Sequence, residues 1–133
     1  MKHTPTVVLF TMTLALLAAL PAQGSFSGHW AMRTPELFGD AEALVWQVGP
    51  YVFGVVQGWG TYVMLGQAEG NVMTCQMTQL GRTVVDATEA IPCGARLRPD
   101  GMRFNGWIDF RGHARPFCGA DEPGRIPTKC KGY

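Results

Sequence analysis

The chain has 133 residues, a hydrophobic content of 47% and a formal net charge of +1, which fit a single domain with a substantial core. A net charge this small argues against non-specific nucleic-acid binding, which needs a strong excess of Lys and Arg. Residues 25–90 carry an acidic excess and residues 91–133 a basic excess. Either the two halves neutralise each other within one fold, or the second half offers an anion-binding face.

The N-terminus has the pattern of an export signal. A short basic stretch precedes an apolar run over residues 7–20, Pro21 ends the run, and small residues lie at the −3 and −1 positions of a cleavage site after Gly24. The run is too short to span a bilayer, so residues 1–24 are predicted to be a cleaved signal peptide. The sequence has no second apolar segment of spanning length. We therefore expect a periplasmic or secreted protein with one domain over 25–133 and no membrane span after cleavage.

Residues 31–43 lack the alternation of a strand, and Thr34-Pro35-Glu36 resembles the start of a helical turn. We expect an irregular N-terminal arm over 25–43. Beyond it, Gly- and Pro-rich turns recur about every 8–12 residues between short stretches rich in Val, Thr and aromatic residues, the signature of an antiparallel sandwich or barrel. An irregular tail is expected over 119–133. The expected strands are 44–48, 51–57, 61–66, 71–79, 82–89, 95–98, 102–110 and 113–118.

Two of these stretches alternate clearly between an apolar and a polar face. Met73, Cys75 and Met77 share one face of 71–79, and Phe104 and Ile108 share one face of 102–110. This pattern suits a meander closed on one core. We expect an all-β fold, a small antiparallel meander of about seven to eight short strands forming a closed or nearly closed barrel. Glycines inside the strands suggest bends that let a small sheet curl: Gly54, Gly66 and Gly106. The core is expected to include Trp46 with Leu44 and Val48, and also Met64, Met73, Met77 and Met102.

The four cysteines form an even set in a predicted exported domain, which predicts two disulfides. Three pairings are possible. We favour Cys118–Cys130, which would pin the tail, and this leaves Cys75–Cys93 to tie a strand to a turn. The sequence has no Cys-x-x-Cys spacing, and residues 25–133 contain only His29 and His113. We therefore expect disulfides and no metal site.

Directly after the predicted cleavage site stands Phe26-Ser27-Gly28-His29-Trp30. A Gly-x-Trp at this place, followed by a meander of short strands, resembles the lipocalin-like, or calycin-type, small barrels, which include bacterial protease inhibitors. The resemblance implies that Trp30 begins the first strand and closes one end of the barrel, with Arg111 or Arg115 of the last strand packed on it. It also implies a binding protein. The chain departs from that pattern because it is shorter than a full-length lipocalin and because no regular strand is expected directly after Trp30.

The sequence offers few groups for catalysis. Residues 25–133 contain two serines, both near the predicted new N-terminus, and lack a Gly-x-Ser-x-Gly elbow, a phosphate loop and a dinucleotide fingerprint. The cysteines are expected to be oxidised and so unavailable as thiolates. Asp86, Glu89, Asp109 and His113 remain candidates for an unrecognised hydrolase site, but solvated surface groups are the favoured interpretation. We expect no enzymatic activity and no cofactor.

Two tryptophans suggest a binding surface instead. Trp59 lies between glycines at an expected hairpin tip, and Trp107 lies on the face of its strand opposite the core residues. If both rings are exposed, they form with Arg103, Arg111 and His113 a patch that has the composition of protein-interface hot spots. The alternative is that each ring folds back on a neighbouring loop. We expect an exported, non-enzymatic domain that binds another protein, with an inhibitor-like role as one form of that binding. The alternative is a carrier of a small apolar ligand in the barrel interior.

Overall fold

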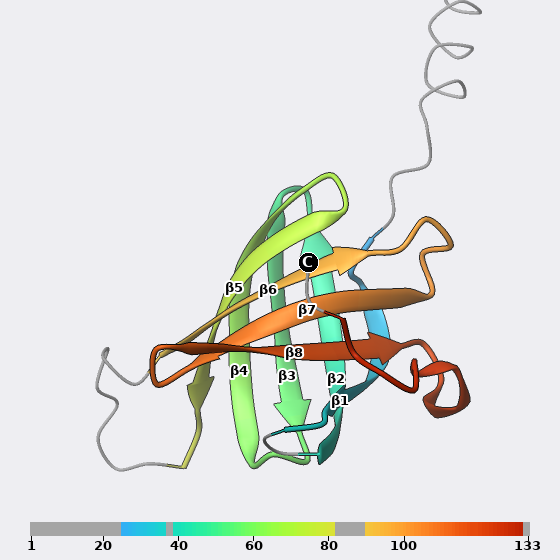
Figure 1. The fold of residues 1–133 in the computed structure, drawn as a ribbon. Coiled ribbons are helices and arrows are strands. Elements are labelled where there is room, and N and C mark those ends of the chain that lie inside the picture. The colour runs from blue at the N-terminus through green and yellow to red at the C-terminus, as the bar shows by residue number, and fades with distance from the viewer. Residues whose placement is uncertain (1–24, 37–38, 82–89, 132–133) are drawn as a thin grey trace, which may run out of the picture.

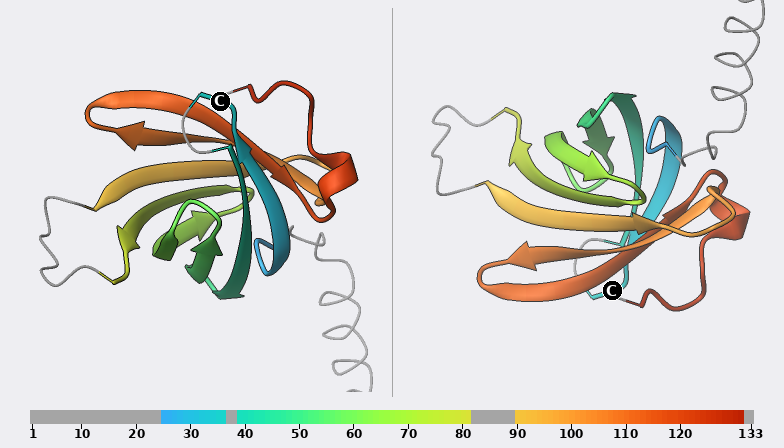
Figure 2. Two further views of the ribbon diagram at one scale, coloured as in Figure 1. Left: turned by 90° about the horizontal axis from the view of Figure 1, so that it is seen from below. Right: turned by 90° about the horizontal axis from the view of Figure 1, so that it is seen from above.

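The computed structural model describes residues 25–36, 39–81 and 90–131. Eight strands follow one another in chain order around a closed barrel, and each is antiparallel to its neighbours (Figures 1 and 2). The expected all-β meander is therefore confirmed, and the barrel is closed. The strands are β1 (Gly28–Thr34), β2 (Gly39–Val48), β3 (Tyr51–Gln57), β4 (Thr61–Glu69), β5 (Val72–Gln79), β6 (Ile91–Leu97), β7 (Arg103–Phe110) and β8 (His113–Ala120), and the short 3₁₀-helix η2 (Pro123–Arg125) follows them.

The expected irregular arm over 25–43 is wrong, because β1 and the first half of β2 lie there. The two strands pair in register from Gly28 opposite Val45 to Thr34 opposite Gly39. Alternation is hidden in β1 because Trp30, Ala31 and Met32 are all buried. Ala31 points outward, where Pro123 and Ile126 of the C-terminal tail lie beside it. The expected strand 51–57 coincides with β3, and the expected strand 82–89 lies outside the described residues.

The inner face of β2 carries small side chains, and its outer face carries large ones. Ala41, Ala43 and Val45 are buried, whereas the larger Leu44, Trp46 and Val48 are exposed. The expectation that these three large side chains belong to the core is therefore wrong. An eight-stranded barrel has an interior just wide enough for its side chains to fill. Rings from β1, β7 and β8 already occupy that space, so β2 contributes small residues.

Aromatic rings and methionines fill the interior. Phe104 meets Trp30 and Phe117 edge-on, with ring centroids 5.4 and 5.2 Å apart. A Cβ atom on Gly106 would collide with the ring of Phe117, and one on Gly119 with the ring of Phe104, so each glycine makes room for one ring. The expected burial of Met64, Met73 and Met77 is confirmed; that of Met102 is wrong, because Met102 precedes β7 in an exposed turn.

Both favoured disulfides are present. Cys75 and Cys93 lie directly opposite each other on β5 and β6, with Cα atoms 4.8 Å apart, so this bond joins two strands and not a strand and a turn. The Cα atoms of Cys118 and Cys130 are 5.1 Å apart, and their bond holds the C-terminal tail against β8. Two disulfides indicate an oxidising, extracytoplasmic environment. Within the described part of the chain, no helix has the length and apolar character needed to cross a membrane.

Candidate functional site

Trp59 does not reach the surface. Its ring is 8% exposed and packs edge-on against Phe117, with centroids 6.5 Å apart, and its Nε1–H donates a hydrogen bond to the backbone oxygen of Gly39 at 3.0 Å. Gly58 and Gly60 flank it with positive φ angles of 119° and 100°. These backbone conformations favour glycine and let the turn direct the ring back into the barrel. Trp59 is therefore not exposed, and the alternative of a folded-back ring is right.

The other four residues of the expected binding patch lie on the β7–β8 hairpin but do not converge. Trp107 is partly exposed on the outer face of β7. Arg103 lies at the start of β7 and forms an ion pair with Asp100 at 2.9 Å, whereas Arg111 and His113 lie at the far turn. Arg111 adopts a positive φ of 54° and stacks over the ring of Phe110, 5.1 Å from its centroid. At about 3.3 Å per residue, the two ends of the hairpin are about 23 Å apart, so these side chains do not form one patch.

Trp30 occupies the place that the lipocalin-like resemblance implies, since it lies near the start of β1 and is buried. Its Nε1–H donates to the backbone oxygen of Phe26 at 2.7 Å. The arginines implied to pack on it have other contacts: Arg115 forms an ion pair with Glu36 at 3.1 Å, and Arg111 lies over Phe110. The ring that the structure places against Trp30 is that of Phe104.

The residues considered for catalysis do not form an acid–base pair in the described part of the chain. Asp109 is paired with Ala114 across the β7–β8 hairpin, so Asp109 and His113 point to opposite faces. One carboxylate oxygen of Asp109 is buried and lacks a hydrogen-bond partner among the described atoms. Asp86 and Glu89 lie outside the described residues. Over the described ranges, no group of three His, Cys, Asp or Glu side chains could hold a metal ion.

The most distinctive surface lies on the outside of β2, β3 and β4. Six large apolar side chains there are between 41% and 65% exposed, and two partly buried valines extend the set. Cross-strand pairing makes them contiguous, since each lies directly opposite another member on the next strand. We call this set the apolar face; it consists of Leu44, Trp46, Val48, Tyr51, Phe53, Val55, Val63 and Leu65.

The apolar face is as large as the largest apolar patch of a typical monomer. Aromatic side chains offer roughly 150–250 Å² each, so the exposed fractions correspond to about 500 Å² of apolar surface in total. The largest apolar patch on a typical monomer measures about 300–600 Å² and is often functional. A standard interface buries about 800 Å² per partner. The apolar face therefore has the size of the centre of such an interface.

The charged groups around the apolar face are mainly acidic. Residues 39–81 contain no Lys, Arg or His. Asp40 and Glu42 precede Leu44 in the outward row of β2, and Glu69 ends the outward row of β4. Asp40 is paired with Arg33 of β1 at 2.9 Å, and this hydrogen bond raises the pKa of the Arg33 guanidinium. Glu42 lies 3.7 Å from His29.

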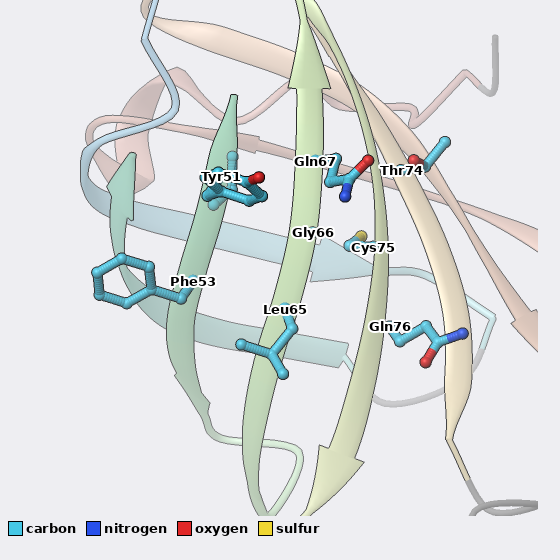
Figure 3. A pocket seen from close by; sticks show the side chains of 9 residues that line it. Tyr51, Phe53, Leu65, Gly66, Gln67, Thr74, Cys75 and Gln76 are labelled. Carbon is cyan, nitrogen blue, oxygen red and sulfur yellow. The ribbon is translucent and has the colours of Figure 1, made fainter. Parts of the chain in front are cut away.

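A hollow of about 540 Å³ opens beside the apolar face, over β3, β4 and β5 (Figure 3). Two rows of outward side chains border it, and both rows run across the strands. Between them Val52, Gly66 and Cys75 point inward, so the floor is formed largely by backbone. We call this hollow the transverse groove; its first row is Tyr51, Gln67 and Thr74, and its second row is Phe53, Leu65 and Gln76.

The described residues thus define an eight-stranded, all-antiparallel, closed β-barrel with two disulfides and one large outward apolar face. Comparison with protein-family models found no match, and searches of curated proteins and of solved structures found none either. The apolar face was missed in the sequence because Leu44, Trp46 and Val48 were assigned to the core. One signal was present: residues 51–56 are apolar at nearly every position, which in a strand means that both faces are apolar.

Proposed function

We propose that this protein is an exported, non-enzymatic binding domain that engages another protein through the apolar face. The observation that carries the proposal is the contiguous set of exposed large side chains on β2, β3 and β4. Trp and Tyr are enriched at the energetic centres of protein interfaces, because they bury much area at little entropic cost. Leaving such a set in water is unfavourable, and a partner that covers it removes the cost.

The magnitudes are adequate for a stable complex. If the partner buries an apolar area similar to the roughly 500 Å² of this face, about 1,000 Å² is buried on the two proteins together. At about 25 cal/mol per Å², the gross gain is about 25 kcal/mol. Association itself costs about 4–15 kcal/mol, and ordering of side chains adds to that cost. Interfaces of one size range from micromolar to picomolar affinity, so the area makes a complex feasible and does not set its affinity.

Export is supported by the two disulfides and by the signal-like pattern of residues 1–24, which lie outside the described residues. The Gly28-His29-Trp30 motif at the start of β1 supports the likeness to lipocalin-type and inhibitor barrels. An inhibitor-like role is part of the proposal on that ground.

The carrier alternative gains no support from the interior. The void lined by Trp30, Met64, Met73 and Phe104 measures about 30 Å³. That is room for about one water molecule, whereas pockets for small molecules measure about 300–1,000 Å³. A carrier would have to expand the barrel before it could bind.

The proposal is tested by site-specific photocrosslinking in the native host. A photoreactive residue replaces Leu65 in the apolar face, and the matched control replaces Ala114, an exposed strand position on β8. We expect one discrete adduct with another protein from position 65 and none from position 114. Trp46→Ser should remove the adduct. The proposal is wrong if position 65 gives no adduct or the same adducts as position 114, and an adduct with a second copy would show self-association in place of a different partner.

A further inference from the structure

The transverse groove has two chemically different halves. One half of the groove is apolar and belongs to the apolar face; it consists of Tyr51, Phe53 and Leu65. The other half carries two amides and a hydroxyl, those of Gln67, Gln76 and Thr74. None of these side chains is charged at neutral pH. The groove therefore suits a ligand that is apolar in one part and forms neutral hydrogen bonds in another.

The two glutamines lie on opposite sides of the groove. Gln67 of β4 belongs to the first row and Gln76 of β5 to the second, and both are exposed (Figure 3). A glutamine amide offers both donors and an acceptor. This combination matches the N–H and C=O groups of a peptide backbone. A chain lying in the groove would have one amide on each side of it.

The dimensions fit a short extended segment. β3 and β5 are two interstrand spacings apart, about 10 Å, which an extended chain crosses in about three residues. The hollow has a volume of about 540 Å³ and is open to solvent. Gly66 keeps the floor low, because a Cβ atom there would meet the backbone oxygen of Thr74 at 2.7 Å.

Charge defines the partner further. Glu69 follows Gln67 in the outward row of β4, and residues 39–81 carry no cation. An acidic segment would be repelled, whereas a Lys or Arg beside Glu69 would be attracted.

We infer that the partner lays an extended peptide segment across the transverse groove, with an apolar side chain against Tyr51, Phe53 and Leu65 and a Lys or Arg beside Glu69. Gln67 and Gln76 bond the main chain of this segment. The inference rests on the proposed function and specifies the form of its partner.

The test uses a phage-displayed library of random linear peptides, selected on the oxidised full-length mature protein. We expect enriched peptides to share one large apolar residue close to a Lys or Arg. The affinity of a synthetic enriched peptide is then measured by fluorescence anisotropy. Gln67→Ala combined with Gln76→Ala should weaken binding about tenfold, and Glu69→Lys about threefold. Glu122→Lys, an exposed control near η2, should leave binding unchanged.

All substituted positions are exposed, and thermal unfolding of each variant verifies that the barrel is intact. Enriched peptides that bind the glutamine variant as tightly as the wild type, or that are acidic, would overturn the inference. If no peptide is enriched but position 65 still crosslinks to a protein, the partner docks with a folded surface; the inference then fails and the proposed function stands. If neither experiment gives a product, both fail.

Discussion

Trp46 of β2 and Phe53 of β3 lie directly opposite each other on the outside of the barrel, with ring centroids 5.9 Å apart and planes within 18° of parallel. Stacked aromatic pairs contribute about 0.5–1.5 kcal/mol beyond their buried area. The pair therefore holds two large side chains rigid at the surface, where they are 47% and 41% exposed. Rigid aromatic anchors bind with a small loss of side-chain entropy, so we place this pair at the centre of the proposed interface.

Trp46→Ser should abolish partner binding while leaving the fold intact. Interface hot spots cost about 2 kcal/mol or more when truncated, which corresponds to a loss of at least about thirtyfold in affinity. The loss is measured as crosslinking yield from position 65, and urea unfolding measures stability. Trp107→Ser is the matched control, because it removes a partly exposed outward tryptophan from β7. If Trp107→Ser removes the adduct and Trp46→Ser does not, the partner binds the β7–β8 hairpin and the apolar face is the wrong surface.

Gly106→Ala should destabilise the barrel by about 1–3 kcal/mol, the usual cost of overpacking a core. The new methyl group would collide with the ring of Phe117 and approach the backbone oxygen of Gly94 at 2.5 Å. Gly124→Ala is the control, since a Cβ atom there meets nothing within 4 Å. Urea denaturation at neutral pH measures both changes. Equal stability of the two variants would contradict the close packing of ring against glycine.

Replacing Cys118 and Cys130 together by Ala should lower the free energy of unfolding by about 3 kcal/mol. The bond closes a sequence separation of 12 residues and holds the tail against β8. In limited proteolysis with trypsin, the double variant should be cleaved after Lys129 faster than the wild type. A double variant with the same stability and the same cleavage rate would show that contacts other than the disulfide hold the tail.

The interior methionines should resist oxidation while the exposed one reacts. Met73 and Met77 are each 4% exposed, whereas Met102 is 40% exposed. Dilute hydrogen peroxide applied to the folded protein should convert Met102 to the sulfoxide first, as measured by peptide mass spectrometry. Oxidation of Met73 and Met77 at the same rate as Met102 would reveal an open interior and favour the carrier alternative over the proposed function.

Asp100 should stabilise the fold at neutral pH and not in strong acid. Hydrogen bonds from the backbone N–H of Met102 and from Arg103 lower the pKa of its carboxyl group. A carboxyl with a lowered folded-state pKa stabilises the protein above its unfolded pKa of about 3.9, and the effect disappears as pH falls through the folded value. The difference in unfolding free energy between wild type and Asp100→Asn should therefore be present at pH 7 and absent in strong acid. Asp121→Asn is the comparison variant. If wild type and Asp100→Asn differ in unfolding free energy by the same amount at pH 7 and in strong acid, the assignment of a lowered pKa to Asp100 is contradicted.

Much of the fold follows from local sequence. The turn signals and the side-chain alternation located β3 fully and most of β5, β7 and β8, because both depend on neighbouring residues. The disulfide pairing also followed, since the tail needs a tether and only one pairing then remains. β1 was missed because buried residues on both of its faces erase the alternation.

The candidate site could not be located in the same way. A period-two pattern states that two faces of a strand differ, and it does not state which face points inward. On β2 the larger side chains suggested the core, yet Ala43 points inward and Trp46 outward. Trp59 was misplaced for a related reason, since only its contact with Phe117, 58 residues later in the chain, shows where its ring goes.

By itself, then, the sequence determined most of the strands, the turns and the presence of two disulfides, because these depend on short-range periodicity, on turn chemistry and on an even cysteine count. The tertiary structure decided which face of β2 is the surface. Closure of eight strands leaves a narrow interior, and Trp30, Phe104 and Phe117, which are far apart in the chain, fill it together. The large side chains of β2, β3 and β4 find no room inside, and they form the outward face to which we propose that a partner binds.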